Sequence, residues 1–486
     1  MDTAQYLLRA EQFTEGLQRE EYLHFSGLKD EYRTQEIFEE FADLFSREAV
    51  LARLEDRDDR EGRRLAEFAV RGHIEERLRE LTEHIANAES AAEVECNGQR
   101  MPFLAALGQV TQEADRARRG ALEDAVAEAM SRHNHHRAQR VAGQRQIAQE
   151  LGFPDYRALC EDLSGQPLRA LAQELAGFVE DTQSAYRAHL EEALGRVEIA
   201  PHGATDWDLR WVMFAPQYME MFPRERLIPA AEATLSVLGV SLSDQANVHL
   251  DLQPRPKKYP RPCCVPISVP GEIWIVASPR GGYADFLSFF HELGHAEHFA
   301  GANAELSCAY RVMGDDALTE AFAFLLQSVV LDRDWLRHFL GVEAPPESLF
   351  RAGRLIDHWC VRRCVGKIAY ELELHGGDGR PAEMGQRYAR LVGDAFGIRV
   401  SPEAHLFDVD DWFSSARYLR AFMLDACLRL HLRERFGRAW FRSPEAGGWL
   451  RSQWQRGTEM TAAELAGEIG FQLGLAPLRD RLLEDP

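Results

Sequence analysis

The sequence has no apolar run of 18 residues, although hydrophobic residues make up 45% of its 486 positions. A helix needs about 20 mostly apolar residues to cross a bilayer, so no membrane span is expected. The first ten residues contain an acidic residue and no long apolar core, which is not the pattern of a secretory signal. We therefore expect no membrane partner and a cytoplasmic protein.

Cysteine is scarce, with eight residues and no CxxC pair. A chain of this length can bury a large core without disulfides, so reduced thiols in the cytoplasm are expected. Basic residues are also fewer than acidic ones: the sequence has 56 lysines and arginines and 78 aspartates and glutamates, which gives a net charge of −22. This charge argues against nucleic acid or an anionic membrane as a partner, and it leaves the oligomeric state open.

Strand-like alternation is missing from roughly the first 195 residues, where Glu, Arg, Leu and Ala follow helical spacing. The predicted helices there cover residues 35–55, 60–86, 121–150, 155–163 and 168–194. Helices are expected again over 335–374, with a break at 376–381, and then to the end of the chain. The Pro- and Gly-containing segment 197–208 is a candidate boundary, which predicts a helical lobe at 1–200 and a second lobe at 201–486.

One short run, residues 272–277, is rich in β-formers and lies between Pro and Gly clusters. An exposed edge strand is a natural receptor for peptides, because its unpaired N–H and C=O groups recognise any sequence. An ordinary hairpin is the alternative interpretation of this run.

The segment from His291 to His295 has the pattern HExxH. Apolar residues recur at helical spacing in 286–290 and 296–300, so the motif is expected on a helix. Residues four apart share a helix face, and both imidazoles can therefore reach one ion. Glu292 is placed to reach a water molecule on that ion. Two imidazoles, a third ligand and an open position are typical of catalytic zinc, whereas structural zinc is closed by four protein ligands.

A third ligand is expected from Glu320, which begins a second apolar run at 321–331. A carboxylate facing the core is expensive to bury unless a cation or another partner compensates its charge. The alternative is a capping or helix-dipole interaction at this helix start.

His298 shares the face of His291 but lies about 10.5 Å further along the axis, too far for bonds of about 2.1 Å to the same ion. It is interpreted as a residue behind the ligands or lining a cleft. Gly294 indicates a close approach to the motif helix.

Histidine is also concentrated at residues 133–136, with Arg132 and Arg137 on either side. Such a cluster can bind a metal, but a solvated helix end is the favoured interpretation.

The motif, together with Glu320 after 24 intervening residues, resembles the thimet oligopeptidase and oligoendopeptidase F family of zinc peptidases. The angiotensin-converting enzymes are more distant relatives of the same design. The resemblance implies that His291, His295 and Glu320 bind one zinc ion and that Glu292 is the general base. It also implies a mostly α, two-lobed helical fold with a deep central channel and a small β-sheet beside the active site.

A second cluster, residues 404–419, carries the same resemblance. His405 and Tyr418 match the family's oxyanion-binding His and last Tyr, although the interval between them is about one residue longer. Trp412 and Ser415 stand where the family has further tyrosines. A core tyrosine with a satisfied hydroxyl is the alternative interpretation of Tyr418.

The function expected from these residues is zinc-dependent hydrolysis of internal peptide bonds in short unfolded peptides. One alternative is a zinc carboxypeptidase or dipeptidyl carboxypeptidase, in which Arg417 or Arg420 would hold the terminal carboxylate. A second alternative is a peptide-binding protein without turnover.

Overall fold

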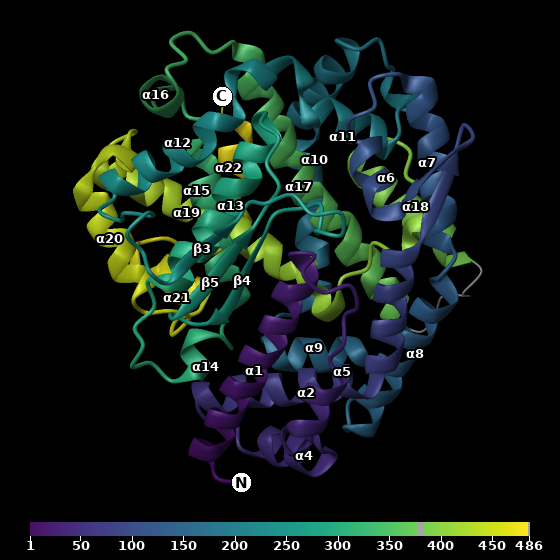
Figure 1. Cartoon of the computed structure of the whole chain (residues 1–486), viewed down its shortest axis with the longest axis vertical. Helices are drawn as coiled ribbons and strands as arrows, with labels where there is room; N and C mark the ends of the chain where they lie inside the picture. The colour runs from purple at the N-terminus through teal and green to yellow at the C-terminus, as the bar shows by residue number, and fades with distance from the viewer. Residues whose placement is uncertain (377–382, 485–486) are drawn as a thin grey trace.

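Helices dominate the structure, a computed structural model that describes residues 1–376 and 383–484 (Figure 1). The helices up to Gly195 are α1 (Thr3–Phe25), α2 (Gln35–Glu40), α3 (Ala42–Phe45), α4 (Arg47–Glu55), α5 (Arg60–Ala91), α6 (Phe103–Val110), α7 (Arg116–Ser131), α8 (Asn134–Glu150), α9 (Tyr156–Ser164) and α10 (Leu168–Gly195). The later helices are α11 (Asp206–Phe214), α12 (Arg224–Val237), α13 (Tyr283–Ala300), α14 (Cys308–Arg311), α15 (Asp316–Val329), α16 (Arg333–Trp335), α17 (Glu347–His375), α18 (Met384–Phe396), α19 (Ser414–Phe436), α20 (Pro444–Trp454), α21 (Ala462–Glu468) and α22 (Leu475–Leu483). The predicted mostly α class is confirmed.

Short irregular helices and two small sheets complete the secondary structure of the described residues. The short helices are η1 (Pro201–Gly203), η2 (Pro216–Met221), η3 (Leu336–Leu340), η5 (Pro402–His405), η6 (Asp411–Phe413) and η7 (Trp440–Arg442). The strands are β1 (Glu93–Cys96), β2 (Gln99–Pro102), β3 (Val248–Asp251), β4 (Cys263–Ser268) and β5 (Glu272–Val276). In the part of the chain that the structure describes, no helix is long and apolar enough to cross a membrane.

The predicted helices at 60–86, 155–163 and 168–194 are confirmed within a few residues as α5, α9 and α10. The prediction of single helices at 35–55 and 121–150 was wrong. In the first, the Ser46 side chain caps α4 by accepting a hydrogen bond from the backbone of Ala49. In the second, α7 ends at Ser131 and α8 starts at Asn134. The predicted helix at 335–374 is also interrupted, because α17 starts only after Pro346, and 377–381 of the predicted break lie outside the described residues.

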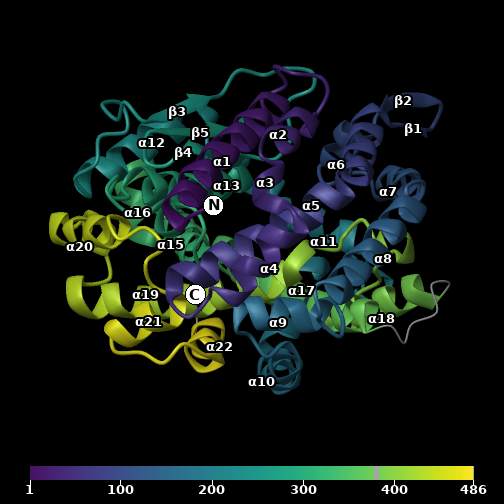
Figure 2. The same ribbon diagram turned by 90° about the horizontal axis from the view of Figure 1, so that it is seen from below.

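The first 195 residues also contain a hairpin that alternation alone did not predict. β1 and β2 pair antiparallel, and Asn97 and Gly98 between them both have positive φ. An Asn-Gly pair in this conformation is the typical two-residue hairpin turn, so the dipeptide was the signal to use. The hairpin lies at the periphery of the molecule (Figure 2).

The second sheet has the order β3-β5-β4, with β3 and β5 parallel and β4 and β5 antiparallel. The strand predicted at 272–277 is therefore present, but it is the central strand and not an edge. β3 and β4 form the two edges of this sheet. The expectation that 272–277 receives peptide is wrong, because both sides of β5 are already hydrogen-bonded.

Helices cover both faces of this sheet. Tyr22 of α1 stacks on Trp274 of β5, with ring centroids 4.4 Å apart. On the other face, Ile273 and Ile275 belong to the same buried cluster as the aromatic residues of α13. The N-terminal helix thus supports the strand that precedes the HExxH segment in the chain.

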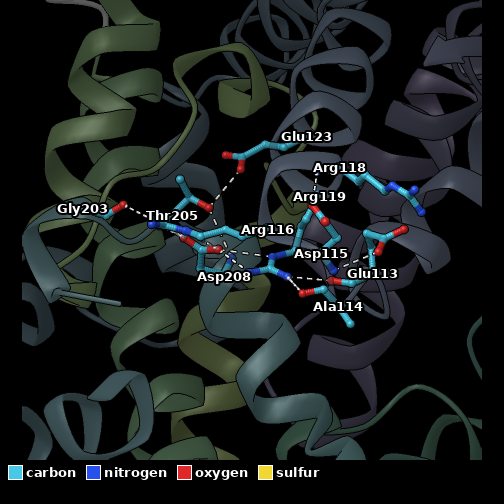
Figure 3. Close-up of polar contacts among 10 residues, drawn as sticks. All are labelled: Glu113, Ala114, Asp115, Arg116, Arg118, Arg119, Glu123, Gly203, Thr205 and Asp208. Atoms are coloured by element: carbon cyan, nitrogen blue, oxygen red, sulfur yellow. Dashed lines mark hydrogen bonds and ion pairs between the residues drawn. The ribbon is translucent and has the colours of Figure 1, made fainter. Parts of the chain in front are cut away.

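An ion-pair group centred on the buried Asp208 joins α7, which precedes residue 200, to α11, which follows it (Figure 3). Asp208 accepts hydrogen bonds from Arg119 at 2.7 Å and from Arg116 at 2.9 Å. Asp208 and Thr205 also form a reciprocal capping box at the start of α11. The expected lobes at 1–200 and 201–486, and the channel between them, remain predictions.

Candidate active site

The HExxH segment lies in the middle of α13, as its spacing predicted. Phe286, Phe290 and Leu293 are buried and hold one face of the helix in the core. His291 and His295 lie on the face that meets α15, where Glu320 occupies the second turn. Two neighbouring helices therefore present the three predicted ligands to one point.

The three side chains form a triangle of the size that a tetrahedral metal requires. The Nε2 atoms of His291 and His295 are 3.2 Å apart. Glu320 Oε2 lies 3.4 Å from His291 Nε2 and 3.6 Å from His295 Nε2. Ligands bound tetrahedrally at about 2.1 Å are roughly 3.4 Å from each other. The triangle could thus hold a divalent metal ion and leave a fourth coordination position open.

Gly294 lets the two helices approach closely enough to build this triangle. A Cβ atom on Gly294 would lie 2.5 Å from Cα of Ala323 and 2.7 Å from the carbonyl oxygen of Phe322. The close approach predicted at this glycine is confirmed, and its partner is α15. A side chain here would push away the helix that carries Glu320.

Hydrogen bonds behind the ligands orient the imidazole of His295 toward the triangle and hold the imidazole of His298 away from it. His295 Nδ1 lies 2.9 Å from Oγ1 of Thr319, so a ring protonated at Nδ1 directs the Nε2 lone pair at the triangle. His298 instead donates from Nε2 to the carbonyl oxygen of Gly457 at 3.0 Å. His298 is buried, so it does not line a cleft, and the cleft interpretation of this residue was wrong. Thr319 was not predicted, although it directly precedes Glu320.

The protonation states of His295 and Glu320 suit a cation. At His291 burial lowers the pKa, but the neighbouring Glu320 carboxylate outweighs it and raises the pKa above the ordinary value. Burial lowers the pKa of His295 to about 4, which leaves this imidazole neutral at pH 7. Burial opposes ionisation of Glu320, but His295 and His291 outweigh it and hold its pKa below the ordinary value. Glu320 Oε2 is also buried and accepts no hydrogen bond from the described residues. A buried, ionised oxygen without a donor fits a metal ligand.

Glu292 points from the same helix toward the sheet. Its Oε2 accepts a hydrogen bond of 2.8 Å from the backbone N–H of Cys264 in β4. Burial is the main reason that the pKa of Glu292 is raised to about 7, and the Glu320 carboxylate adds to it. A cation at the triangle would lower this pKa again. A carboxylate that titrates near neutrality can accept and return a proton.

Of the two predicted oxyanion groups, the structure brings only Tyr418 to the triangle. The Glu320 carboxylate and burial raise the pKa of Tyr418 well above its ordinary value, so the phenol keeps its proton. The phenol also interacts directly with that carboxylate. His405 lies in η5, where its Nδ1 is 2.9 Å from the carbonyl oxygen of Pro402. None of its described contacts is with the triangle, and its oxyanion role remains a prediction.

No family model and no curated protein sequence matches the chain. Solved structures do match. One is the crystal structure of a protein described as an oligoendopeptidase F from Bacillus anthracis str. Ames, with a TM-score of 0.63. The chain has the oligoendopeptidase F fold. The match covers 95% of this chain and 83% of the Bacillus protein at 13% sequence identity, so it extends far beyond the motif region. The resemblance to oligoendopeptidase F expected from the motif is confirmed at the level of the fold.

Proposed function

We propose that this chain is a zinc-dependent metallopeptidase that cleaves internal bonds of short unfolded peptides. The main observation behind this proposal is the ligand triangle, whose atoms are 3.2 to 3.6 Å apart. Glu292, which is not one of the three ligands, provides a further carboxylate on the same helix. An ion held by His291, His295 and Glu320 would be positioned for catalysis, because three protein ligands leave one position for a reactant. The fold shared with a protein described as an oligoendopeptidase F adds support.

The roles of the side chains follow from their positions. When bound, a zinc ion supplies Lewis acidity that activates water and polarises the scissile carbonyl. Glu292 accepts the proton of the attacking water and donates it to the departing amine nitrogen, which completes the cleavage of the C–N bond. The Cys264 N–H holds the Glu292 carboxylate in place from the side of β4.

Tyr418 is proposed to donate a hydrogen bond from its phenol to the oxygen that becomes negative as the carbonyl is attacked. Its raised pKa keeps the donor protonated at neutral pH. Tyr418 is 38% exposed as a residue, so a substrate can reach it beside Glu320. Donors of this kind contribute to the rate because the negative charge is larger in the transition state than in the substrate.

The edge strand β4 is proposed as the peptide-binding element. It pairs with β5 on one side only, among the described strands, and its Cys264 contacts Glu292. Backbone pairing with an edge strand recognises extended chains of any sequence, which fits short unfolded peptides. The eight cysteines form no disulfide, which suits a reducing compartment such as the cytoplasm.

The two arginines considered for a terminal carboxylate are already paired. Arg417 binds Asp316 at 2.5 Å and Glu67 at 2.6 Å. Arg420 binds Asp315 at 2.8 Å. Because each guanidinium is neutralised by carboxylates of the same chain, neither is free to clamp the end of a peptide, and this favours endopeptidase activity over carboxypeptidase activity.

The test uses pairs of peptides of about 5 to 20 residues that differ only in a free or an amidated C-terminus. We expect identical internal cuts in both members of each pair, identified by mass spectrometry of the products. Cuts restricted to the free C-termini would replace the endopeptidase proposal with the carboxypeptidase alternative. No cuts in any peptide, with metal bound, would leave only peptide binding.

A further inference from the structure

We propose that His84, His133 and His136 form a second metal site, which binds zinc or another imidazole-preferring divalent transition metal such as nickel, cobalt or copper. His84 lies in α5, whereas His133 directly precedes α8 and His136 lies in the first turn of α8. The site is built from other elements than the triangle of α13 and α15, and it does not depend on the peptidase proposal.

The three imidazoles are already gathered around one point. One ring nitrogen from each lies within 4.8 Å of one from each of the others. The ring centroids of His84 and His136 are 4.2 Å apart, and His133 lies 6.2 Å from both. Ligands of a tetrahedral ion are roughly 3.4 Å apart, so small rotations of these side chains would bring nitrogens within 4.8 Å of one another to ligand spacing.

Two of these imidazoles hold a nitrogen that has no partner. Nδ1 of His133 and Nδ1 of His136 are both buried and make no hydrogen bond with the described residues. Buried polar atoms are normally satisfied, and an unsatisfied one indicates a missing ligand, ion or water. Two such atoms within a three-histidine group are what a metal site without its ion presents.

The positive charges near the three imidazoles are compensated by carboxylates, which suits a bound cation. The nearby arginines do not repel a cation strongly, because each has a carboxylate partner. Arg137 pairs with Glu89, and Arg132 pairs with Glu128 at 3.2 Å.

The donor set selects the class of metal. Three imidazoles without a carboxylate are a poor site for magnesium or calcium, which prefer oxygen ligands. They suit zinc, nickel, cobalt and copper. An ion there would link α5 to the start of α8, because His84 comes from α5 and the other two ligands come from the start of α8. From the sequence alone only residues 133–136 stand out as a histidine cluster. His84 could not be assigned to it, because it is 49 positions away from His133.

The experiment measures zinc binding by calorimetry in the full-length chain with His291→Ala and His295→Ala, so that the triangle cannot contribute. We expect one remaining zinc site in this parent. His84→Ala should weaken that site at least about tenfold, since loss of even an outer partner of a metal ligand typically costs 10- to 100-fold. His136→Ala should have the same effect.

His135→Ala is the matched control, because this histidine lies in the same turn but outside the three-residue group. We expect it to leave zinc affinity within about twofold of the parent. Circular dichroism checks the fold of each variant, and His84→Gln replaces His84→Ala if the latter unfolds. Absence of a zinc site in the parent would overturn the proposal. So would unchanged affinity in the folded His84 variant, or an equal loss in His135→Ala.

Discussion

The backbone N–H of Cys264 donates a 2.8 Å hydrogen bond to Oε2 of Glu292, which ties the proposed general base to the edge strand β4. The donor is a main-chain group, so its position depends on the sheet and not on the identity of residue 264. A peptide lying along β4 would therefore meet the base at a fixed place. This relationship connects the β-sheet, the HExxH helix and the proposed chemistry.

Glu292→Gln should reduce peptide cleavage by about 10²- to 10⁴-fold, because an amide cannot accept the water proton. The metal content should stay at the wild-type value, since Glu292 is not a corner of the ligand triangle. Initial rates and metal content are measured on the same preparation.

Glu297→Gln is the control for this substitution, because Glu297 is a buried glutamate of the same helix. Its carboxylate accepts a hydrogen bond of 3.1 Å from the Gln245 side chain and does not belong to the ligand triangle. Its activity should remain near the wild-type value. Full activity of Glu292→Gln would remove Glu292 from the mechanism.

Thr319→Val should weaken zinc binding by about 10- to 100-fold, because it removes the oxygen that accepts from His295 Nδ1. Thr319→Ser keeps that oxygen and should bind zinc like the wild type. Competition with a chelator of known affinity gives the two dissociation constants. Equal affinities of the valine and serine variants would show that this hydrogen bond does not position the imidazole.

Gly294→Ala should lower the free energy of unfolding by about 1–3 kcal/mol, the usual result of overpacking a core. The new methyl group would meet the backbone of Ala323, which cannot move without shifting α15. Zinc affinity should fall as well, because α15 carries Glu320.

Gly177→Ala in α10 is the matched control, since a Cβ atom there meets nothing within 4 Å. It should raise the free energy of unfolding by about 0.4–1 kcal/mol. Denaturant unfolding measures both variants, and equal stability changes would contradict the packing argument.

Asp208→Asn should lower the free energy of unfolding by about 3–5 kcal/mol at pH 7, because it leaves the buried Arg119 without its counter-ion. Burial opposes ionisation of Asp208, but its hydrogen bonds with Arg116 and Arg119 outweigh it and lower its pKa. The stability from this shift is present above the ordinary carboxyl pKa of about 3.9 and is lost as the pH falls further.

The stability difference between the wild type and Asp208→Asn should therefore be constant near neutrality and shrink below about pH 3.9. Denaturant unfolding across this pH range measures it. A difference that is already small at pH 7 would show that the ion pairs of Asp208 contribute little to the free energy of unfolding.

The residues of the triangle could be predicted because the information is local. His291 and His295 are one helical turn apart, and Glu320 is a charged residue that directly precedes an apolar run. The close approach at Gly294 was predictable for the same reason. Its partner was not, because Ala323 lies on another helix.

Features that depend on distant segments escaped prediction. The Cys264 N–H is a backbone group, and nothing in the side-chain pattern shows that it faces Glu292. The order of the second sheet depends on β3, which has no link to β5 in local sequence, so the central strand was mistaken for an edge. The breaks near Ser46 and between α7 and α8 were missed since apolar spacing continues across them, whereas caps and turns decide where a helix ends.

Catalysis by a metal ion at the triangle is tested most directly by following cleavage of a mixed peptide pool by mass spectrometry before chelation, after chelation and after zinc is restored. We expect internal cuts that disappear with the metal and return at the same bonds with zinc, but do not return in His291→Ala. Cleavage that persists in the metal-free enzyme, or that zinc restores equally in His291→Ala, would contradict this expectation.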